Sequence, residues 1–142
     1  KIIINKMTKS DAHEKELLSN YLKYKRGHTV IIPDDPYSRY DIESYKDGKR
    51  YVWEIKNRTC DSKKYGDTII ESGKLAALLE EHCTAYVVNI FTDGVTTVAD
   101  ISETPYELQN RYCQKTAWYG GGKKSKILVS FKNEDCMKID LY

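Results

Sequence analysis

Residues 40–56 read Tyr-Asp-Ile-Glu-Ser-Tyr-Lys-Asp-Gly-Lys-Arg-Tyr-Val-Trp-Glu-Ile-Lys, which is two alternating segments on either side of Asp47-Gly48. Asp-Gly between alternating segments is the strongest short hairpin signal that a sequence offers. We therefore predict a β-hairpin over segments 40–45 and 51–56, with Asp47-Gly48 as its two-residue turn. In that register Asp41 lies directly opposite Glu54.

The two faces of this hairpin differ in character, because neighbouring side chains on a strand point to opposite sides. One face is apolar and is expected to lie against the core; it carries Tyr40, Ile42, Tyr51, Trp53 and Ile55. The other face is mostly charged and carries Asp41, Glu43, Val52, Glu54 and Lys56. Like charges directly opposite on a sheet are destabilising, and a divalent cation between Asp41 and Glu54 would offset the repulsion. This pattern indicates a metal-dependent enzyme; the alternative is a solvated face with a Glu–Lys pair.

The totals describe one ordinary globular domain. The chain has 142 residues, of which 40% are hydrophobic and 31% charged, and we expect a single domain over residues 1–142. It has no apolar run near the roughly 18 residues that span a membrane. The four cysteines and three histidines show no zinc-ligand spacing, so free thiols in a cytoplasmic protein are expected.

Charge is distributed unevenly along the chain, although the net charge is only +2. Residues 75–110 contain six carboxylates and no Lys or Arg, whereas residues 111–126 contain five basic residues and no acid. Such asymmetry is typical of a one-sided basic surface that binds a phosphate backbone. A solvated charged face is the alternative.

The order of elements predicts an α/β fold. Helices are expected at 11–25, from a capping box at Thr68-Ile69-Ile70-Glu71 to 82, and from a second capping box at Thr104-Pro105-Tyr106-Glu107 to 115. Further strands are expected at 29–32, 85–91, 96–101, 126–131 and 137–141. The prediction is an αβββαβ core over about 11–91, with a mixed central sheet flanked by helices, and a C-terminal α-β-β extension over about 92–142.

This order, with Asp41 on one strand and Glu54-Ile55-Lys56 on the next, resembles the PD-(D/E)XK nuclease superfamily. That group includes restriction endonucleases, Holliday-junction resolvases and repair exonucleases. Tyr40 stands where the family name has proline. The resemblance covers about 11–91 and implies a restriction-endonuclease-like fold that hydrolyses nucleic acid with a metal ion.

The metal and the catalytic residues follow from the same motif. Mg²⁺ prefers one or two carboxylates with waters and substrate phosphate, and Asp41 and Glu54 suit it; Mn²⁺ should substitute. The resemblance implies the Ile55 carbonyl as a third ligand. Lys56 shares the face of Glu54 and, beside a metal, would orient or deprotonate the attacking water.

Two further carboxylates are candidates for the site. Glu14 precedes Leu17 and Leu18 by three and four residues, so it shares the inward face of the first helix. The resemblance implies that Glu14 reaches the metal waters; the alternative is a carboxylate stabilised by the helix dipole. Glu43 lies on the same strand face as Asp41 and is a secondary candidate.

Nucleic-acid contacts are expected from four basic residues. Lys74, early in the second helix, matches a place where the family often has a basic residue, and Arg58 follows the Glu-x-Lys strand. Lys123 and Lys124 belong to the segment 118–124, which carries two aromatic residues and three glycines. This segment would clamp DNA by phosphate contact and base stacking, or is a flexible connection.

The sequence therefore predicts a magnesium-dependent deoxyribonuclease, a structure-selective endonuclease of the resolvase kind. Such an enzyme would act as a homodimer, because two symmetric strands must be cut. The alternative is a catalytically silent nuclease-fold module that binds nucleic acid or assembles a complex. The set of Asp41, Glu54 and Lys56 argues against a silent module, since a dead site has no reason to keep two opposed carboxylates.

Overall fold

The predicted hairpin is present in the register expected from Asp47-Gly48. The computed structural model describes residues 12–113 and 124–142. Strand β2 (Ile42–Lys46) pairs antiparallel with β3 (Lys49–Asn57), and Ile42 lies opposite Trp53. Asp47 and Gly48 have φ angles of 52° and 78°, the left-handed backbone that a two-residue hairpin turn requires.

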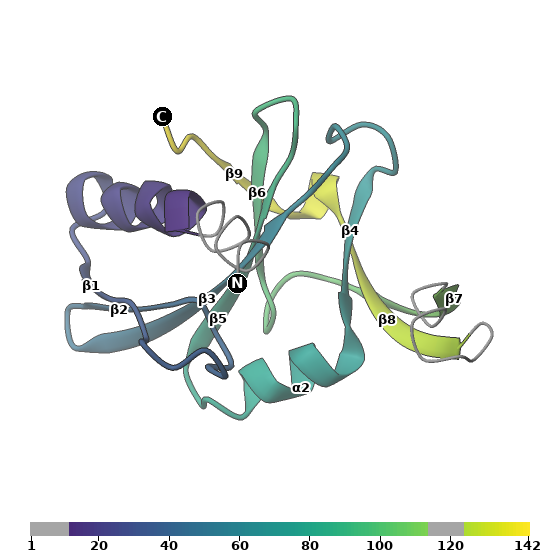
Figure 1. Ribbon diagram of the computed structural model, residues 1–142, viewed down its shortest axis with the longest axis horizontal. Helices are drawn as coiled ribbons and strands as arrows, with labels where there is room; N and C mark the ends of the chain where they lie inside the picture. Colours follow the sequence, from purple (N-terminus) through teal and green to yellow (C-terminus); the bar gives the residue numbers. More distant parts are fainter. Residues whose placement is uncertain (1–11, 114–123) are drawn as a thin grey trace, which may run out of the picture.

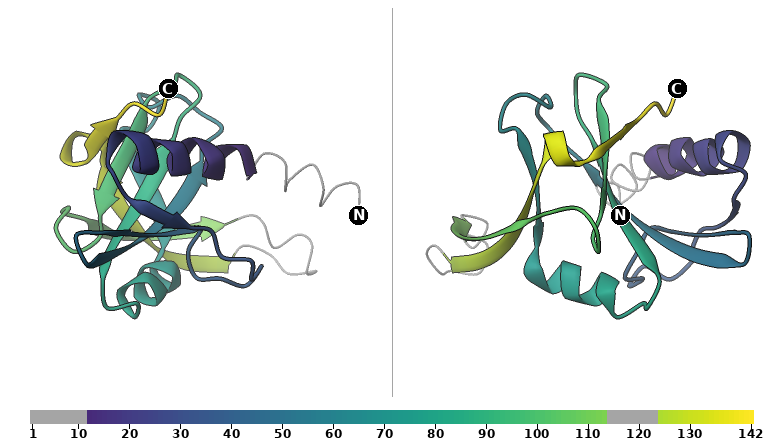
Figure 2. Two further views of the ribbon diagram at one scale, coloured as in Figure 1. Left: turned by 90° about the vertical axis from the view of Figure 1, so that its left-hand side faces the viewer. Right: turned by 180° about the vertical axis from the view of Figure 1, so that it is seen from behind.

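The hairpin belongs to a six-stranded mixed sheet (Figure 1). The strand order is β1-β2-β3-β5-β6-β9, with β3 and β5 parallel and the other pairs antiparallel. The remaining strands are β1 (Thr29–Ile31), β5 (Thr84–Ile90), β6 (Thr96–Asp100) and β9 (Met137–Ile139). The first helix spans residues 12–20, continues as a π-helical turn, η1 (Tyr21–Lys25), and covers one face; α2 (Ser72–Leu79) lies on the other (Figure 2).

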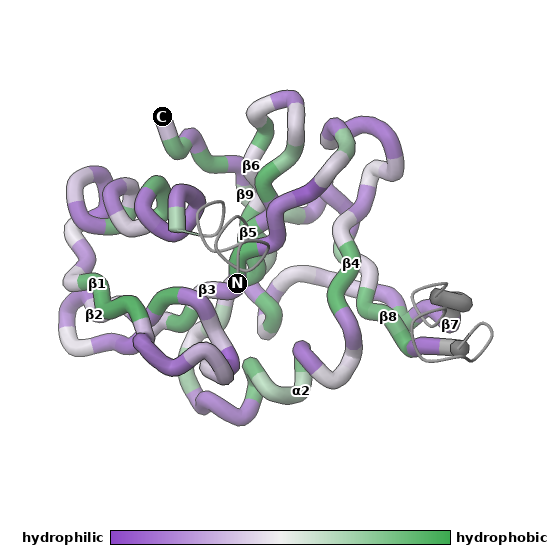
Figure 3. Tube along the Cα trace, viewed as in Figure 1, coloured by the Kyte–Doolittle hydropathy of each residue, from purple (hydrophilic) through white to green (hydrophobic). Residues whose placement is uncertain are grey.

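The sheet has a core on each face, because its central strands contribute buried apolar side chains to two separate clusters. The green stretch of β5 in Figure 3 belongs to these strands. On the side of the first helix, Leu18 and Leu22 pack with Trp53 and Val88. On the side of α2, Leu75 and Leu78 pack with Val52, Ala85 and Val87. The hairpin face that carries Val52 and Glu54 is therefore covered as well, which argues against the alternative of a solvated face. Among the described residues, no helix is long and apolar enough to cross a membrane.

A second sheet replaces the helix predicted at 104–115 and the first turn of the helix predicted at 68–82, whose remainder is α2. Strands β4 (Asp67–Glu71), β8 (Lys124–Lys132) and β7 (Glu107–Cys113) form a three-stranded antiparallel sheet in the order β4-β8-β7. Both capping-box predictions were wrong at these positions, and the C-terminal α-β-β extension is a set of strands with one 3-10 turn, η3 (Asn133–Asp135). In β4 the alternation that buries Thr68 and Ile70 outweighs the local cap signal.

Smaller differences affect single residues. Tyr40 packs on the α2 side instead of with Ile42, because β2 begins only at Ile42 and the alternation does not extend to Tyr40. Trp53 is buried as expected, whereas Ile55 is only partly buried. Leu79 ends the short helix α2 and is exposed rather than inward.

Candidate active site

The candidate site lies at the open end of the hairpin, where β3 extends past the first residue of β2. The paired register of β2 and β3 ends at Ile42 and Trp53, while β3 continues to Asn57. Residues 54–57 of β3 remain paired with β5, and a cavity of about 200 Å³ opens on their other side, lined by Glu14, Lys15, Asp41, Glu54, Ile55 and Asn57. The two opposed carboxylates of the hairpin and the carboxylate of the first helix therefore line the same cavity.

Asp41 is fixed by the backbone of β3. Its amide N–H donates to the Trp53 carbonyl at 2.9 Å, and its Oδ2 accepts a 2.7 Å hydrogen bond from the Ile55 N–H. The other oxygen, Oδ1, has the Lys15 ammonium 3.9 Å away. One oxygen thus orients the side chain, and the other is only loosely paired.

Glu54 is a buried carboxylate, with 7% of its surface exposed. The Lys74 ammonium lies 2.9 Å from Oε2, as an ion pair without hydrogen-bond geometry, and the Lys56 ammonium lies 3.8 Å from Oε1. Burial and the nearby charge of Asp41 raise the pKa of Glu54, although Lys74 and Lys56 act in the opposite direction. Folding therefore disfavours the ionised form of Glu54 relative to the unfolded chain.

This environment predicts how stability varies with pH. Because the folded pKa of Glu54 lies above its ordinary 4.5, its contribution to stability is present below pH 4.5 and is lost as pH rises through the folded value. Glu54→Gln should therefore melt at a higher temperature than the wild type at pH 7, and the difference should shrink toward pH 4.5. Thermal unfolding without metal across this range checks the prediction; a variant that is less stable at pH 7 would contradict it.

Glu14 reaches the site, as its position on the inward face of the helix predicted. It lines the cavity, and its Oε2 is buried with no hydrogen-bond partner among the described residues. Lys15 and Asn57 were missed by the sequence analysis. A usable signal existed for both, since Lys15 lies three residues before the buried Leu18 and Asn57 lies two residues after Ile55 on the same strand.

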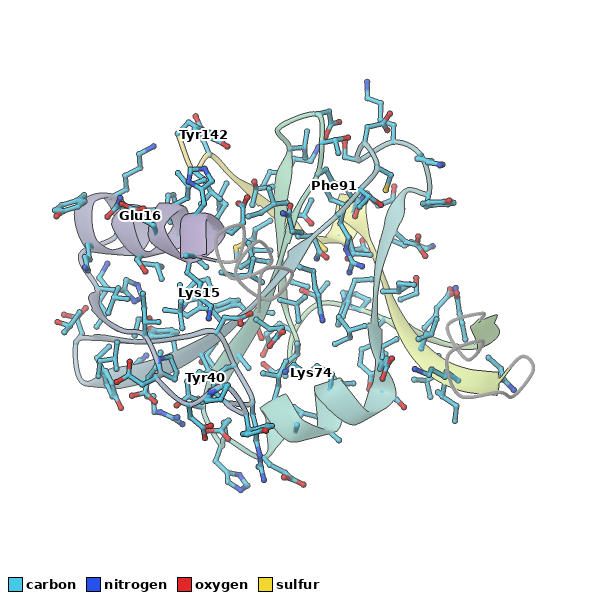
Figure 4. The ribbon with its side chains drawn as sticks, viewed as in Figure 1. Lys15, Glu16, Tyr40, Lys74, Phe91 and Tyr142 are labelled. Carbon is cyan, nitrogen blue, oxygen red and sulfur yellow. The ribbon has the colours of Figure 1, made fainter. Side chains whose placement is uncertain are left out.

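The two lysines predicted near Glu54 take different positions. Lys56 shares the strand face of Glu54, but it stands at the rim, with 38% of its side chain exposed. Lys74 comes from α2, on the opposite side of the sheet from Lys15 (Figure 4). Its ammonium also donates to the Arg39 carbonyl at 2.8 Å. Lys74 therefore points toward the candidate site and pairs with Glu54, and its contact with a nucleic acid stays a prediction.

The donor set suits a hard cation that keeps part of its water. Among residues 12–113 and 124–142, no three His, Cys, Asp or Glu side chains come together as a metal cluster. Two carboxylates plus a backbone carbonyl is the kind of partial coordination that Mg²⁺ accepts, with waters completing the shell. The loosely paired oxygens of Asp41 and Glu54, and the buried unpaired oxygen of Glu14, provide acceptors for such an ion and its waters.

Glu43 has a structural role and does not belong to the site. Its carboxylate accepts hydrogen bonds from Arg50 at 2.7 and 2.9 Å and from the hydroxyls of Tyr40 and Tyr45. Burial alone would raise the pKa of Glu43, but these bonds, led by those of Arg50, lower it. Arg50 also pairs with Glu81 at 3.0 Å, so the network joins the hairpin to the turn after α2.

Arg58 likewise differs from the prediction of a phosphate contact. Its Nε donates to Asn89 Oδ1 at 2.9 Å, and its Nη2 donates to the Ile69 carbonyl at 2.6 Å. Burial lowers the pKa of Arg58. Arg58 therefore connects β5 of the large sheet to β4 of the small one. Lys123 lies outside the described residues, and of Lys124 only the backbone is described, at the start of β8 opposite Cys113.

Arg58→Met should consequently weaken the fold and not DNA binding. Loss of its hydrogen bonds, one of them to the fully buried Asn89, is expected to lower the free energy of unfolding by roughly 1–3 kcal/mol. Denaturant unfolding measures this change, and the matched variant Arg39→Met, which loses an exposed ion pair with Glu80, should lose less than about 1 kcal/mol. A stable Arg58→Met protein with weakened DNA affinity would restore the phosphate-contact interpretation.

Comparisons with known proteins agree with this architecture. No protein-family model matches the chain, and no curated protein has a significantly similar sequence. The fold matches the solved structure of Hjc, a Holliday junction resolvase from the archaeal hyperthermophile Archaeoglobus fulgidus. The TM-score is 0.54 at 12% identity, over 87% of this chain and 93% of that chain. The chain has the restriction-endonuclease-like fold. The restriction-endonuclease-like core expected from Asp41 and Glu54-Ile55-Lys56 is therefore confirmed, with the small sheet as an addition that the sequence analysis did not foresee.

Proposed function

We propose that this protein is a metal-dependent nuclease that hydrolyses phosphodiester bonds of DNA, acting as a structure-selective endonuclease. The observation that carries the proposal is that Asp41, Glu54 and Glu14 line one cavity beside the part of β3 that extends past β2. Burying a carboxylate beside another carboxylate is costly without a compensating cation. Here the folded protein accepts that cost in Glu54, whose pKa is raised by burial and by Asp41.

The chain's own residues divide the work of hydrolysis. A bound Mg²⁺ would supply an activated water and screen the charge that develops on the phosphate. Asp41 and Glu54 would hold that ion, and the Ile55 N–H keeps the Asp41 carboxylate in place. Positive charge at the site comes from Lys56 at the rim and from Lys15, whose ammonium lies 3.9 Å from Asp41 Oδ1. These two ammonium groups would contact a phosphate oxygen and orient the attacking water. Glu14 accepts a hydrogen bond from water in the cavity.

The similarity to Hjc supports branched DNA as the substrate, since that protein is a Holliday junction resolvase. A junction presents two symmetric strands, so we propose a homodimer with one site in each subunit. Mn²⁺ should replace Mg²⁺, because both accept carboxylate and water ligands. The uneven charge of the sequence, with basic residues concentrated before residue 29 and after residue 110, is in keeping with phosphate contact along one side.

A panel of DNA structures tests the proposal. Four-way junctions, flaps, linear duplexes and single strands of matched sequence are incubated with Mg²⁺ or Mn²⁺, and products are resolved on a denaturing gel. We expect cleavage only with metal, and junctions should be cut faster than linear duplexes. Asp41→Asn is the negative control for contaminating nucleases. If no DNA is cut by pure wild-type protein in either metal, the proposal fails and a binding module remains.

A further inference from the structure

A second cavity lies at the other end of the first helix from Glu14. It measures about 610 Å³ and is bounded by the π-helical turn η1, the β2–β3 turn and β9, over the strands β3, β5 and β6. Its volume falls in the range of small-molecule and nucleotide sites. π-Helical turns are frequent at functional sites, and this one contributes Tyr21 and Leu22 to the wall.

Of the aromatic rings on the lining, those of His28, Tyr51, Trp53 and Tyr86 form one contacting group. The rings of Trp53 and Tyr86 stack with centroids 4.4 Å apart, and those of Tyr51 and Tyr86 are nearly parallel at 6.2 Å. His28 lies 5.1 Å from Tyr51 and is held by a 2.9 Å hydrogen bond to the Ser44 hydroxyl, which also accepts from Trp53 Nε1. The result is a rigid aromatic surface, because its members are fixed by each other and by Ser44.

The polar groups around these rings are uncommitted. Within the described part of the chain, the hydroxyls of Tyr51 and Tyr86 have no hydrogen-bond partner, and Arg26, Lys46 and Lys138 have no ion pair. The only acidic side chain on the lining is Asp47. Three free cations against one carboxylate make the rim positive, so an occupant with an anionic group is favoured. The pKa of His28 is lowered by burial, then by Lys46 and Arg26, in keeping with a neutral imidazole beside those two cations.

We propose that this cavity binds an unpaired nucleobase together with its adjacent phosphate. The base would stack on the half-buried ring of Tyr51 where it lines the cavity, because every base offers a π-face, and the tyrosine hydroxyls would meet the polar edge of the base. The phosphate would lie against the three cations of the rim. An apolar partner would leave those cations and hydroxyls unpaired, and an acidic peptide would not use the aromatic surface.

The source of the base is inferred to be a DNA strand, a choice that rests on the proposed function. Glu14 and Arg26 stand twelve residues apart on one helix, which corresponds to roughly 18 Å. A stacked strand rises about 3.4 Å per nucleotide. A strand that runs along this helix from the proposed cleavage site would therefore reach the cavity after about five nucleotides. An unpaired base at that distance from the cut would distinguish branched or flapped DNA from a perfect duplex.

The test uses 2-aminopurine fluorescence in EDTA, so that cleavage plays no part. One arm contains a single-stranded oligonucleotide with one 2-aminopurine, a second the free 2-aminopurine nucleotide, and a third an oligonucleotide with an abasic residue as competitor. We expect quenching in the strand and competition by normal but not by abasic strands. Quenching of the free nucleotide but not of the strand would mean that the cavity binds a base with its phosphate, but as a free nucleotide and not as part of a DNA strand. No quenching in either arm overturns the proposal.

Matched variants locate the binding. Tyr51→Leu should weaken the binding by roughly tenfold, as expected for the loss of one stacking contact, while the exposed Tyr24→Leu on η1 should not. Lys46→Gln should weaken it, whereas Lys49→Gln, directly across the hairpin and off the lining, should not. Equal quenching by wild type and Tyr51→Leu overturns the proposal, whether or not the variant changes its oligomeric state. Wild-type protein that quenches 2-aminopurine in the strand but cuts no DNA would overturn the proposed nuclease function alone.

Discussion

Asp41→Asn and Glu54→Gln are each expected to lower DNA cleavage by at least about a thousandfold while the protein stays folded. Each change keeps the shape of the side chain and removes one anionic ligand, and the charge stabilisation supplied by a catalytic metal is worth several kcal/mol. Glu54→Gln should not lose stability, because the raised pKa of Glu54 means that folding disfavours its ionised form.

Cleavage assays, calorimetric titration with Mn²⁺ and thermal unfolding measure the three quantities on the same variants. Metal affinity and cleavage should fall together, and DNA affinity in EDTA should be kept. Glu103→Gln removes an exposed carboxylate outside the cavity and should behave as wild type. Full cleavage by Glu54→Gln would end the nuclease proposal, and a large loss of stability in the metal-free variant would show that the carboxylates serve the fold.

Lys56→Met is expected to separate metal binding from chemistry. Its ammonium stands at the rim, 3.8 Å from Glu54 Oε1, and removing it leaves the carboxylate ligands intact. Positioned proton-transfer groups typically contribute 10²–10⁴-fold, so cleavage should fall by about that factor.

Calorimetry should show Mn²⁺ binding in Lys56→Met at near wild-type affinity. Lys49→Met, an exposed lysine at the other end of the same strand, is the matched control and should cut normally. If Lys56→Met cleaves normally but Lys15→Met does not, the role assigned to Lys56 belongs to Lys15, whose ammonium is the one beside Asp41.

The sequence was sufficient wherever the deciding signal was local. Asp47-Gly48 determined the hairpin register, and that register placed Asp41 against Glu54. Helical periodicity likewise placed Glu14 inward, where it lines the cavity. These features depend on neighbours within a few residues, so a single chain contains the information for them.

The failures share a different cause, which is pairing over long distances along the chain. Segment 68–71 carries a capping box, but it also alternates, and its pairing with β8 decides in favour of a strand. Segment 107–113 becomes β7 through its pairing with the same strand. Arg58 was misinterpreted for the same reason, since its acceptor Asn89 lies on a distant strand. The partner of Lys74, Glu54, could be guessed only with α2 already docked on the sheet.

The first helix packs against residues 140–142, the last residues of the described part of the chain. Leu141 packs in the same cluster as Leu18 and Leu22, and the Lys25 ammonium donates to the carbonyls of Asp140 and Tyr142. During translation at about 5–20 residues per second, the helix would wait on the order of ten seconds for this partner to be made. Glu14 would not be held in the cavity before then. A nascent chain in which residues 140–142 have not yet emerged from the ribosome is therefore expected to be inactive.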